Sequence, residues 1–269
     1  MPVFSHSRIA TCGVCPLRYK LSYIDFVEPV AEETPETYLD SRVNEALERL
    51  YRNVEREKFI SKKELLSFFT SQWKRNWPES ILIAREEMVE EEYRKQGEKY
   101  LKDYYEKYTP FKEGKIVALE TTDYLSLDDE GQYEYYVRIK RLMDKGQGLY
   151  EIHEYKINPT LPTQEFLDKE PQLAMYSLWL RREFESCRDV RLVWHFLAFN
   201  KEMESWRTDK QLENLRKEIL GKVKAIEAAK KFPARLSRLC DSCLCRGSCS
   251  KWIELEEQGS RSGKKSYKM

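Results

Sequence analysis

Hydrophobic residues recur at helical spacing through the first part of the chain. Residues 41–51 carry an apolar stripe that includes Val43 and Leu50, which predicts an amphipathic helix with Ser41 as its N-cap. Residues 62–108 are rich in Glu, Lys, Leu and aromatic residues and predict several helices, which Pro78 separates and which end before Pro110. This part of the chain is therefore expected to be helical.

From Lys115 the pattern changes to alternating and β-branched residues. It predicts an antiparallel meander of three strands at 115–127, 132–143 and 149–157, with turns at 128–131 and 144–148. Beyond the meander, the pattern predicts a helix at 171–185, a buried strand at 190–199, and a helix at 208–230 capped by Thr208 or Asp209.

This order of elements predicts the α/β class, with a mixed sheet covered by helices. We interpret residues 1–258 as one domain, with a helical insertion at 41–114, a sheet core at 115–200 and a Cys-rich lobe at 232–252. The polar tail at 259–269 is expected to be disordered.

Charge and hydropathy exclude several classes of function. Lys and Arg number 47 and Asp and Glu number 46, so the net charge of +1 provides no global field that would draw the protein to nucleic acid. Any anionic partner must be bound by a local patch. No apolar run approaches the roughly 20 residues of a membrane span, and the N-terminus lacks the features of a signal peptide. We therefore expect a cytoplasmic protein without a membrane partner.

The cysteines are clustered in a way that indicates a metal site. Their odd number, seven, argues against a disulfide framework. Four of them fall within ten residues, two lie near the N-terminus, and Cys187 is isolated and interpreted as a small buried thiol. Because thiolates are soft ligands, the clustered cysteines favour zinc or an iron–sulfur cluster.

Spacing leaves two ligand sets open. One is Cys12, Cys15, Cys240 and Cys243, which would form a paired zinc site, and the other is Cys15, Cys240, Cys243 and Cys249. Either set joins the two ends of the chain, and the chain-entropy model used for disulfides assigns such a closure roughly 5 kcal/mol. The site is therefore interpreted as a structural clasp.

A second constellation lies at the end of the meander. Glu154 and Lys156 are two residues apart on the third strand, so they share one face of the sheet. The following helix begins with Gln172 and Tyr176, which are one turn apart and therefore also share a face. Together these four residues indicate a functional site.

These motifs resemble the RecB-type branch of the PD-(D/E)XK nuclease superfamily, which includes CRISPR-associated iron–sulfur exonucleases and AddB-like nuclease domains. Residues 7–25 resemble its opening segment, 232–249 its closing segment, HEYKI its catalytic strand and QLAMY its following helix. The resemblance implies a PD-(D/E)XK core and a [4Fe-4S] cluster held by Cys15, Cys240, Cys243 and Cys249. It implies catalytic roles for Glu154, Lys156, Gln172 and Tyr176, with DNA as partner and a helicase or another DNA-processing protein as a further candidate partner.

Two positions depart from the family pattern. Asn44 stands where the first helix usually has a His, and Lys140 stands where the second strand has a metal-binding Asp. A Mg2+ or Mn2+ ion needs carboxylate ligands, and like charges a few Å apart repel by about 4 kcal/mol at an effective dielectric of ~20. We therefore expect Lys140 to pair with Glu154 instead, and we place Asp144, the other available carboxylate, in the turn.

Three hypotheses about function follow. The favoured one is a degenerate PD-(D/E)XK protein that keeps the cluster and binds DNA with little metal-dependent cleavage. The second is an active DNA exonuclease or endonuclease, with Glu154 as ligand of Mg2+ or Mn2+ and Lys156 stabilising the developing charge. The third is a zinc-clasped interaction protein that does not bind DNA. Four basic residues near the predicted cleft favour an anionic partner, namely Arg138, Lys140, Arg141 and Lys156.

Overall fold

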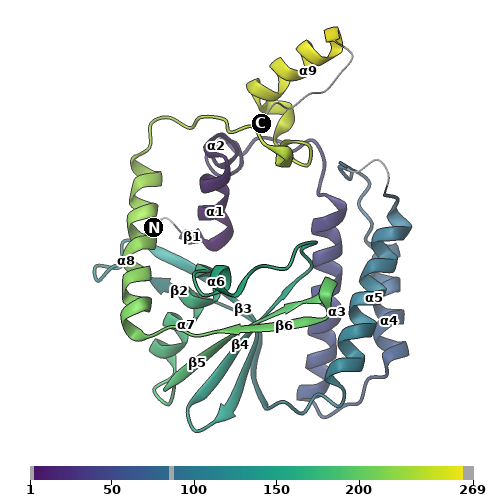
Figure 1. Ribbon diagram of the computed structural model, residues 1–269, viewed down its shortest axis with the longest axis vertical. Helices are drawn as coiled ribbons and strands as arrows, with labels where there is room; N and C mark the ends of the chain where they lie inside the picture. The colour runs from purple at the N-terminus through teal and green to yellow at the C-terminus, as the bar shows by residue number, and fades with distance from the viewer. Residues whose placement is uncertain (1–2, 85–87, 263–269) are drawn as a thin grey trace.

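The computed structural model describes residues 3–84 and 88–262, with side chains described as far as Gln258. Its centre is a mixed sheet (Figure 1) whose strands are β1 (Val3–Ser5), β2 (Lys115–Ser126), β3 (Glu134–Gly146), β4 (Leu149–Lys156), β5 (Asp189–Phe196) and β6 (Lys201–Ser205). Strands β2, β3 and β4 form the expected antiparallel meander. Strand β5 pairs parallel to β4, β6 pairs antiparallel to β5, and β1 pairs parallel to the start of β3.

Helices cover the sheet, which confirms the α/β class. Three of them form a group at one side (Figure 1): α3 (Pro35–Glu55), α4 (Lys62–Arg75) and α5 (Glu90–Tyr108). The others are α1 (His6–Val14), α2 (Pro16–Tyr23), α6 (Gln164–Leu167), α7 (Pro171–Glu183), α8 (Asp209–Ala228) and α9 (Ser250–Ser262). None of the helices within the described residues is long and apolar enough to cross a membrane.

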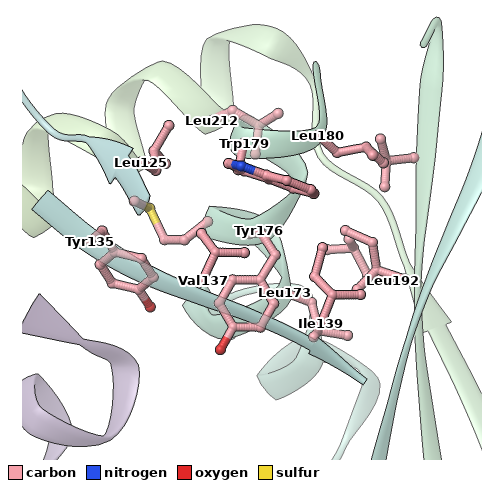
Figure 2. Close-up of a cluster of buried hydrophobic side chains, with 14 of the residues drawn as sticks. Leu125, Tyr135, Val137, Ile139, Leu173, Tyr176, Trp179, Leu180, Leu192 and Leu212 are labelled. Carbon is pink, nitrogen blue, oxygen red and sulfur yellow. The ribbon is translucent and has the colours of Figure 1, made fainter. Parts of the chain in front are cut away.

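Two hydrophobic cores hold these layers together. In the first, shown in Figure 2, Leu173, Tyr176 and Trp179 of α7 pack against Val137 and Ile139 of β3. In the second, α3, α4 and α5 pack on one another around side chains such as Leu47, Phe69 and Leu101. Tyr155 of β4 belongs to this second core, so the two faces of β4 are anchored in different cores.

Several boundaries differ from the sequence prediction. The first long helix begins after Thr34 rather than Ser41, because Thr34 and Thr37 form a capping box and Pro35 occupies the first turn. The strand expected to reach residue 199 ends at Phe196 and continues as a short 3-10 helix, η1 (Leu197–Phe199). Asp144 lies within β3, paired in register with Tyr150 of β4, and not in the turn.

The sequence prediction missed β1, β6, α1, α2 and α9, whose apolar patterns are short or weak. Disorder was expected from residue 259, but helix α9 extends to Ser262. The remaining residues of that tail, 263–269, lie outside the described residues.

A buried polar cluster lies on the face of the sheet that the second core covers. Arg141 of β3 is 1% exposed, and its Nη2 atom lies 2.8 Å from Nδ1 of His153 and 3.3 Å from Nε2 of His195. Its guanidinium also stacks over the ring of Tyr51. We expected Arg141 near the anion-binding cleft, and that expectation is wrong, because its guanidinium is buried against Tyr51 and the two histidines.

Burial and the nearby Arg141 guanidinium hold the pKa of His153 well below its usual value of 6.5, and burial followed by His153 and Arg141 does the same for His195. The unfolded chain therefore binds more protons than the native protein below pH 6.5. As a result, the free energy of unfolding decreases as the pH falls below 6.5.

We predict that the free energy of unfolding, measured by urea denaturation, decreases as the pH falls below 6.5. Each histidine contributes a slope approaching about 1.4 kcal/mol per pH unit. A variant with His153→Gln and His195→Gln should have a lower stability at pH 7 and a shallower slope between pH 6.5 and pH 5. An unchanged slope in that variant would show that other groups cause the acid sensitivity.

Candidate functional site

The four residues singled out on β4 and α7 lie together in the structure. Glu154 and Lys156 stand near the end of β4, and Gln172 stands in the first turn of α7. The Nζ atom of Lys156 donates to Oε1 of Gln172 at 2.8 Å, and Nε2 of Gln172 donates to Oε2 of Glu154 at 3.3 Å. Lys156 Nζ also lies 3.8 Å from Glu154 Oε1. Gln172 thus bridges the two charged side chains.

Tyr176 completes this group from the next turn of α7. It is 5% exposed, its side chain hydrogen-bonds to Gln172, and burial, followed by the Glu154 charge, raises the pKa of its hydroxyl above the usual range. Figure 2 shows its ring at the edge of the core beneath α7. Glu170 is the N-cap of α7, and its Oε2 accepts from the backbone N–H of Gln172 at 2.8 Å.

Lys140 of β3 and Asn44 of α3 meet at the same site. The Nζ atom of Lys140 lies 2.9 Å from Oε1 of Glu154 and donates to Oδ1 of Asn44 at 2.6 Å. Asn44 is oriented by its own Nδ2, which donates to the carbonyl of Asp40 one turn earlier in α3. The predicted pairing of Lys140 with Glu154 is therefore confirmed, and α3 supplies the second oxygen that binds the ammonium.

The charges around this pair support one another. Burial would raise the pKa of Glu154, whose side chain is 3% exposed, but Lys140 and Lys156 outweigh it and the pKa is lowered. Burial would lower the pKa of Lys140, but Glu154 and the nearby Asp40 raise it. The carboxylate and the ammonium are therefore both charged at neutral pH.

Three further residues, which sequence reasoning did not identify, surround the site: His6, Glu170 and Asp40. His6 follows β1, and its Nε2 lies 3.5 Å from Oε1 of Glu170. Burial and then the charge of Lys156 lower the pKa of His6 to about 4, so its ring is neutral at pH 7. Asp40 lies on α3, and burial raises the pKa of its carboxyl. No local sequence signal marks these residues, since the fold brings them to Lys156 and Lys140 from distant elements.

The other residues considered for the site do not join the pair. Arg138 is on the surface, where its Nη2 lies 2.8 Å from Oε2 of Glu120. Asp144 accepts from the backbone N–H of Gly146 at 2.7 Å, four residues along β3 from Lys140. The Asp144 carboxylate is thus hydrogen-bonded within its own strand and does not take part in the site around Glu154.

The Cys-rich lobe, at the top of Figure 1 beside α2 and α9, forms a second candidate site. An apolar cavity there is lined by five cysteines, which are Cys15, Cys240, Cys243, Cys245 and Cys249. Cys12 does not line it, and Cys187 packs beside the first core. Of the two ligand sets left open by spacing, only the second, Cys15, Cys240, Cys243 and Cys249, has all its members on the wall of this cavity.

Backbone groups around the cavity suit thiolate ligands. The Sγ of Cys15, which caps α2, accepts from the N–H of Arg18 and of Arg235 at 3.5 Å each, and the Sγ of Cys240 accepts from Ser237 at 3.4 Å. Such hydrogen bonds orient and stabilise a ligated sulfur. No group of three or more His, Cys, Asp or Glu side chains placed around one metal ion occurs in the described part of the chain. A [4Fe-4S] cluster instead takes one thiolate at each iron, which this donor set can supply.

The pair of Lys140 and Glu154 predicts a specific pattern of stability. Replacing Lys140 by Met leaves Glu154 buried without its closest partner, so the free energy of unfolding should fall by about 3 kcal/mol. Adding Glu154→Gln should restore part of that loss in urea denaturation. Lys222→Met removes an exposed ion pair with Glu218 and serves as the matched control, with an expected change below about 0.5 kcal/mol. Additive effects of the two site substitutions would contradict the coupling.

The chain resembles known proteins at the levels of structure and family. The chain has a similar solved structure described as "Crystal structure of SSO0001", with 13% sequence identity and a TM-score of 0.40 over 93% of this chain and 86% of that chain. A search of curated proteins finds no match. The family model of the PD-(D/E)XK nuclease superfamily matches residues 3–250. Since this match spans nearly the whole chain, the protein belongs to the PD-(D/E)XK nuclease superfamily.

Proposed function

We propose that this protein is a RecB-type member of the superfamily that binds DNA at the site around Glu154 without metal-dependent cleavage. The observation that carries the proposal is the position of the Lys140 ammonium, 2.9 Å from Glu154 and 2.6 Å from Asn44. A divalent ion that used Glu154 would have to displace this ammonium or lie beside it. Either alternative is costly, because the ion wants additional oxygen ligands and is repelled by the positive charge.

In this proposal the site keeps its capacity to hold a phosphate. Lys156 is 30% exposed at its side chain, and Gln172 positions its ammonium while Glu154 lies behind it. The exposed guanidinium of Arg138, two residues before Lys140 on β3, adds positive charge that acts on Glu154. A protein with a net charge of +1 can retain DNA only through such a local group, so binding depends on salt and depends weakly on base sequence.

The proposal also includes a [4Fe-4S] cluster in the Cys-rich lobe. Helices α3, α4 and α5 are then the helical insertion of the nuclease core, and residues 232–252 with Cys15 are the cluster-binding lobe. The cluster would be held by Cys15, Cys240, Cys243 and Cys249 and would cross-link the two ends of the domain. Direct bonds already join these segments, since the N–H of Leu17 donates to the carbonyl of Pro233 at 3.2 Å. A bound cluster would lock this arrangement.

The first test measures DNA binding and cleavage with the whole protein. We expect fluorescence anisotropy to show that Mg2+ does not strengthen binding to a DNA duplex relative to EDTA, with no cleavage in Mg2+ or Mn2+. Lys156→Ala should weaken binding and reduce the slope of log affinity against log salt by about 0.9. Lys222→Ala, which changes an exposed lysine on α8, is the control and should leave that slope unchanged.

The proposal fails if wild-type protein cleaves DNA in Mn2+ and Glu154→Ala abolishes the activity, since the site would then hold a catalytic ion. Absence of DNA binding at low salt would favour an interaction protein. If the Lys140 ammonium excludes the ion, Lys140→Asp should increase the affinity for Mn2+ measured by calorimetry, and Glu154→Ala in that background should remove the gain.

A second test concerns the cluster. Anaerobically purified protein should be brown and contain iron and sulfide in a ratio close to four of each per chain. Cys249→Ser should lose the iron and lower the unfolding temperature, whereas Cys187→Ser, remote from the cavity, should retain it. Colourless protein with one zinc per chain would contradict the cluster and favour a zinc clasp.

A further inference from the structure

The cavity in the Cys-rich lobe is lined by one cysteine more than a [4Fe-4S] cluster requires. The additional thiol is Cys245, which is 7% exposed and is the most buried cysteine among the described residues. The other four thiols of the cavity are only partly buried. Cys245 therefore lies at least as deep in the lobe as the residues expected to be ligands, and its place is not that of a surface thiol.

Cys245 does not have the surroundings of an inert core residue. Its Sγ atom is hydrogen-bonded to Oγ of Ser22 at 3.1 Å, and its side chain also hydrogen-bonds to that of Cys243. Ser22 belongs to α2, the helix that Cys15 caps. Polar contacts thus hold the Cys245 side chain against α2.

The contact between Cys243 and Cys245 places two thiols at one corner of the cavity. Residues 243–246 form a tight turn, in which the N–H of Arg246 donates to the carbonyl of Cys243 at 3.1 Å. This turn folds the two side chains together, although they are two residues apart, and it leaves Cys240 and Cys249 to line the cavity separately. One iron at this corner could therefore be reached by either sulfur.

We propose that Cys243 and Cys245 are interchangeable ligands of one iron of the cluster. The inference rests on the cluster included in the proposed function. When the iron is bound by Cys243, the Cys245 side chain stays hydrogen-bonded to Ser22. When Cys243 is lost or blocked, the sulfur of Cys245 binds the same iron as a thiolate and any proton it carries goes to solvent, so the cluster keeps four thiolate ligands and no electron is transferred.

The experiment compares single and double variants of the whole chain, purified anaerobically. Cys243→Ser and Cys245→Ser should each retain about four irons per chain and the electron paramagnetic resonance signal of the reduced cluster. The double variant should lose both, and Cys187→Ser is the matched control that retains both. Loss of the cluster from either single variant would show that one thiol alone serves as ligand and would overturn the proposal, as would retention in the double variant.

Two measurements keep the outcome interpretable. If wild-type protein holds no iron, the proposed cluster is wrong, whereas iron in wild-type protein but not in Cys243→Ser contradicts only the exchange. If the double variant does not fold, thiol trapping decides. In Cys243→Ser protein, Cys245 should resist N-ethylmaleimide until the iron is removed by a chelator and then react, as detected by mass spectrometry. Equal labelling before and after iron removal would contradict ligation by Cys245.

Discussion

The buried ion pair between Lys140 and Glu154 is the constraint on which the site depends. It joins adjacent strands of the meander, while Asn44 binds the same ammonium from α3 and Gln172 binds the same carboxylate from α7. Removing one member of a buried pair leaves an uncompensated charge, which costs several kcal/mol. The pair therefore fixes the geometry of the elements around it.

The rest of the fold holds this pair from two sides. Strand β4 presents Glu154 and Lys156 on one face and His153 and Tyr155 on the other, where Arg141, His195 and the helical group pack against it. Each face is buried in a separate core, so β4 has little freedom to shift its register. On β3, Lys140 reaches the site, whereas Arg141 is buried against His153 and Tyr51.

The sequence predicts the parts of this architecture that have local signals. The meander, α7 and α8 are recognisable from alternation, turns and caps. The pairing of Lys140 with Glu154 follows from their opposite charges at positions that the resemblance assigns to one site. The roles of His6, Asp40 and Glu170 were not predictable, because tertiary packing brings these side chains together from distant segments. The start of α3 was misplaced, since Thr34 and Pro35 cap the helix before its apolar stripe begins. Neither ligand set drawn from the cysteine spacing includes Cys245, because spacing cannot reveal that its side chain contacts that of Cys243.

The central claim is that the Lys140 ammonium occupies the place of a metal ion. The most direct measurement is anomalous diffraction at the manganese edge from crystals of the wild-type protein soaked in Mn2+. The account predicts no anomalous peak next to Glu154, with Lys140 Nζ in contact with both Glu154 and Asn44. A manganese peak bound by Glu154, with the side chain of Lys140 turned away, would contradict it.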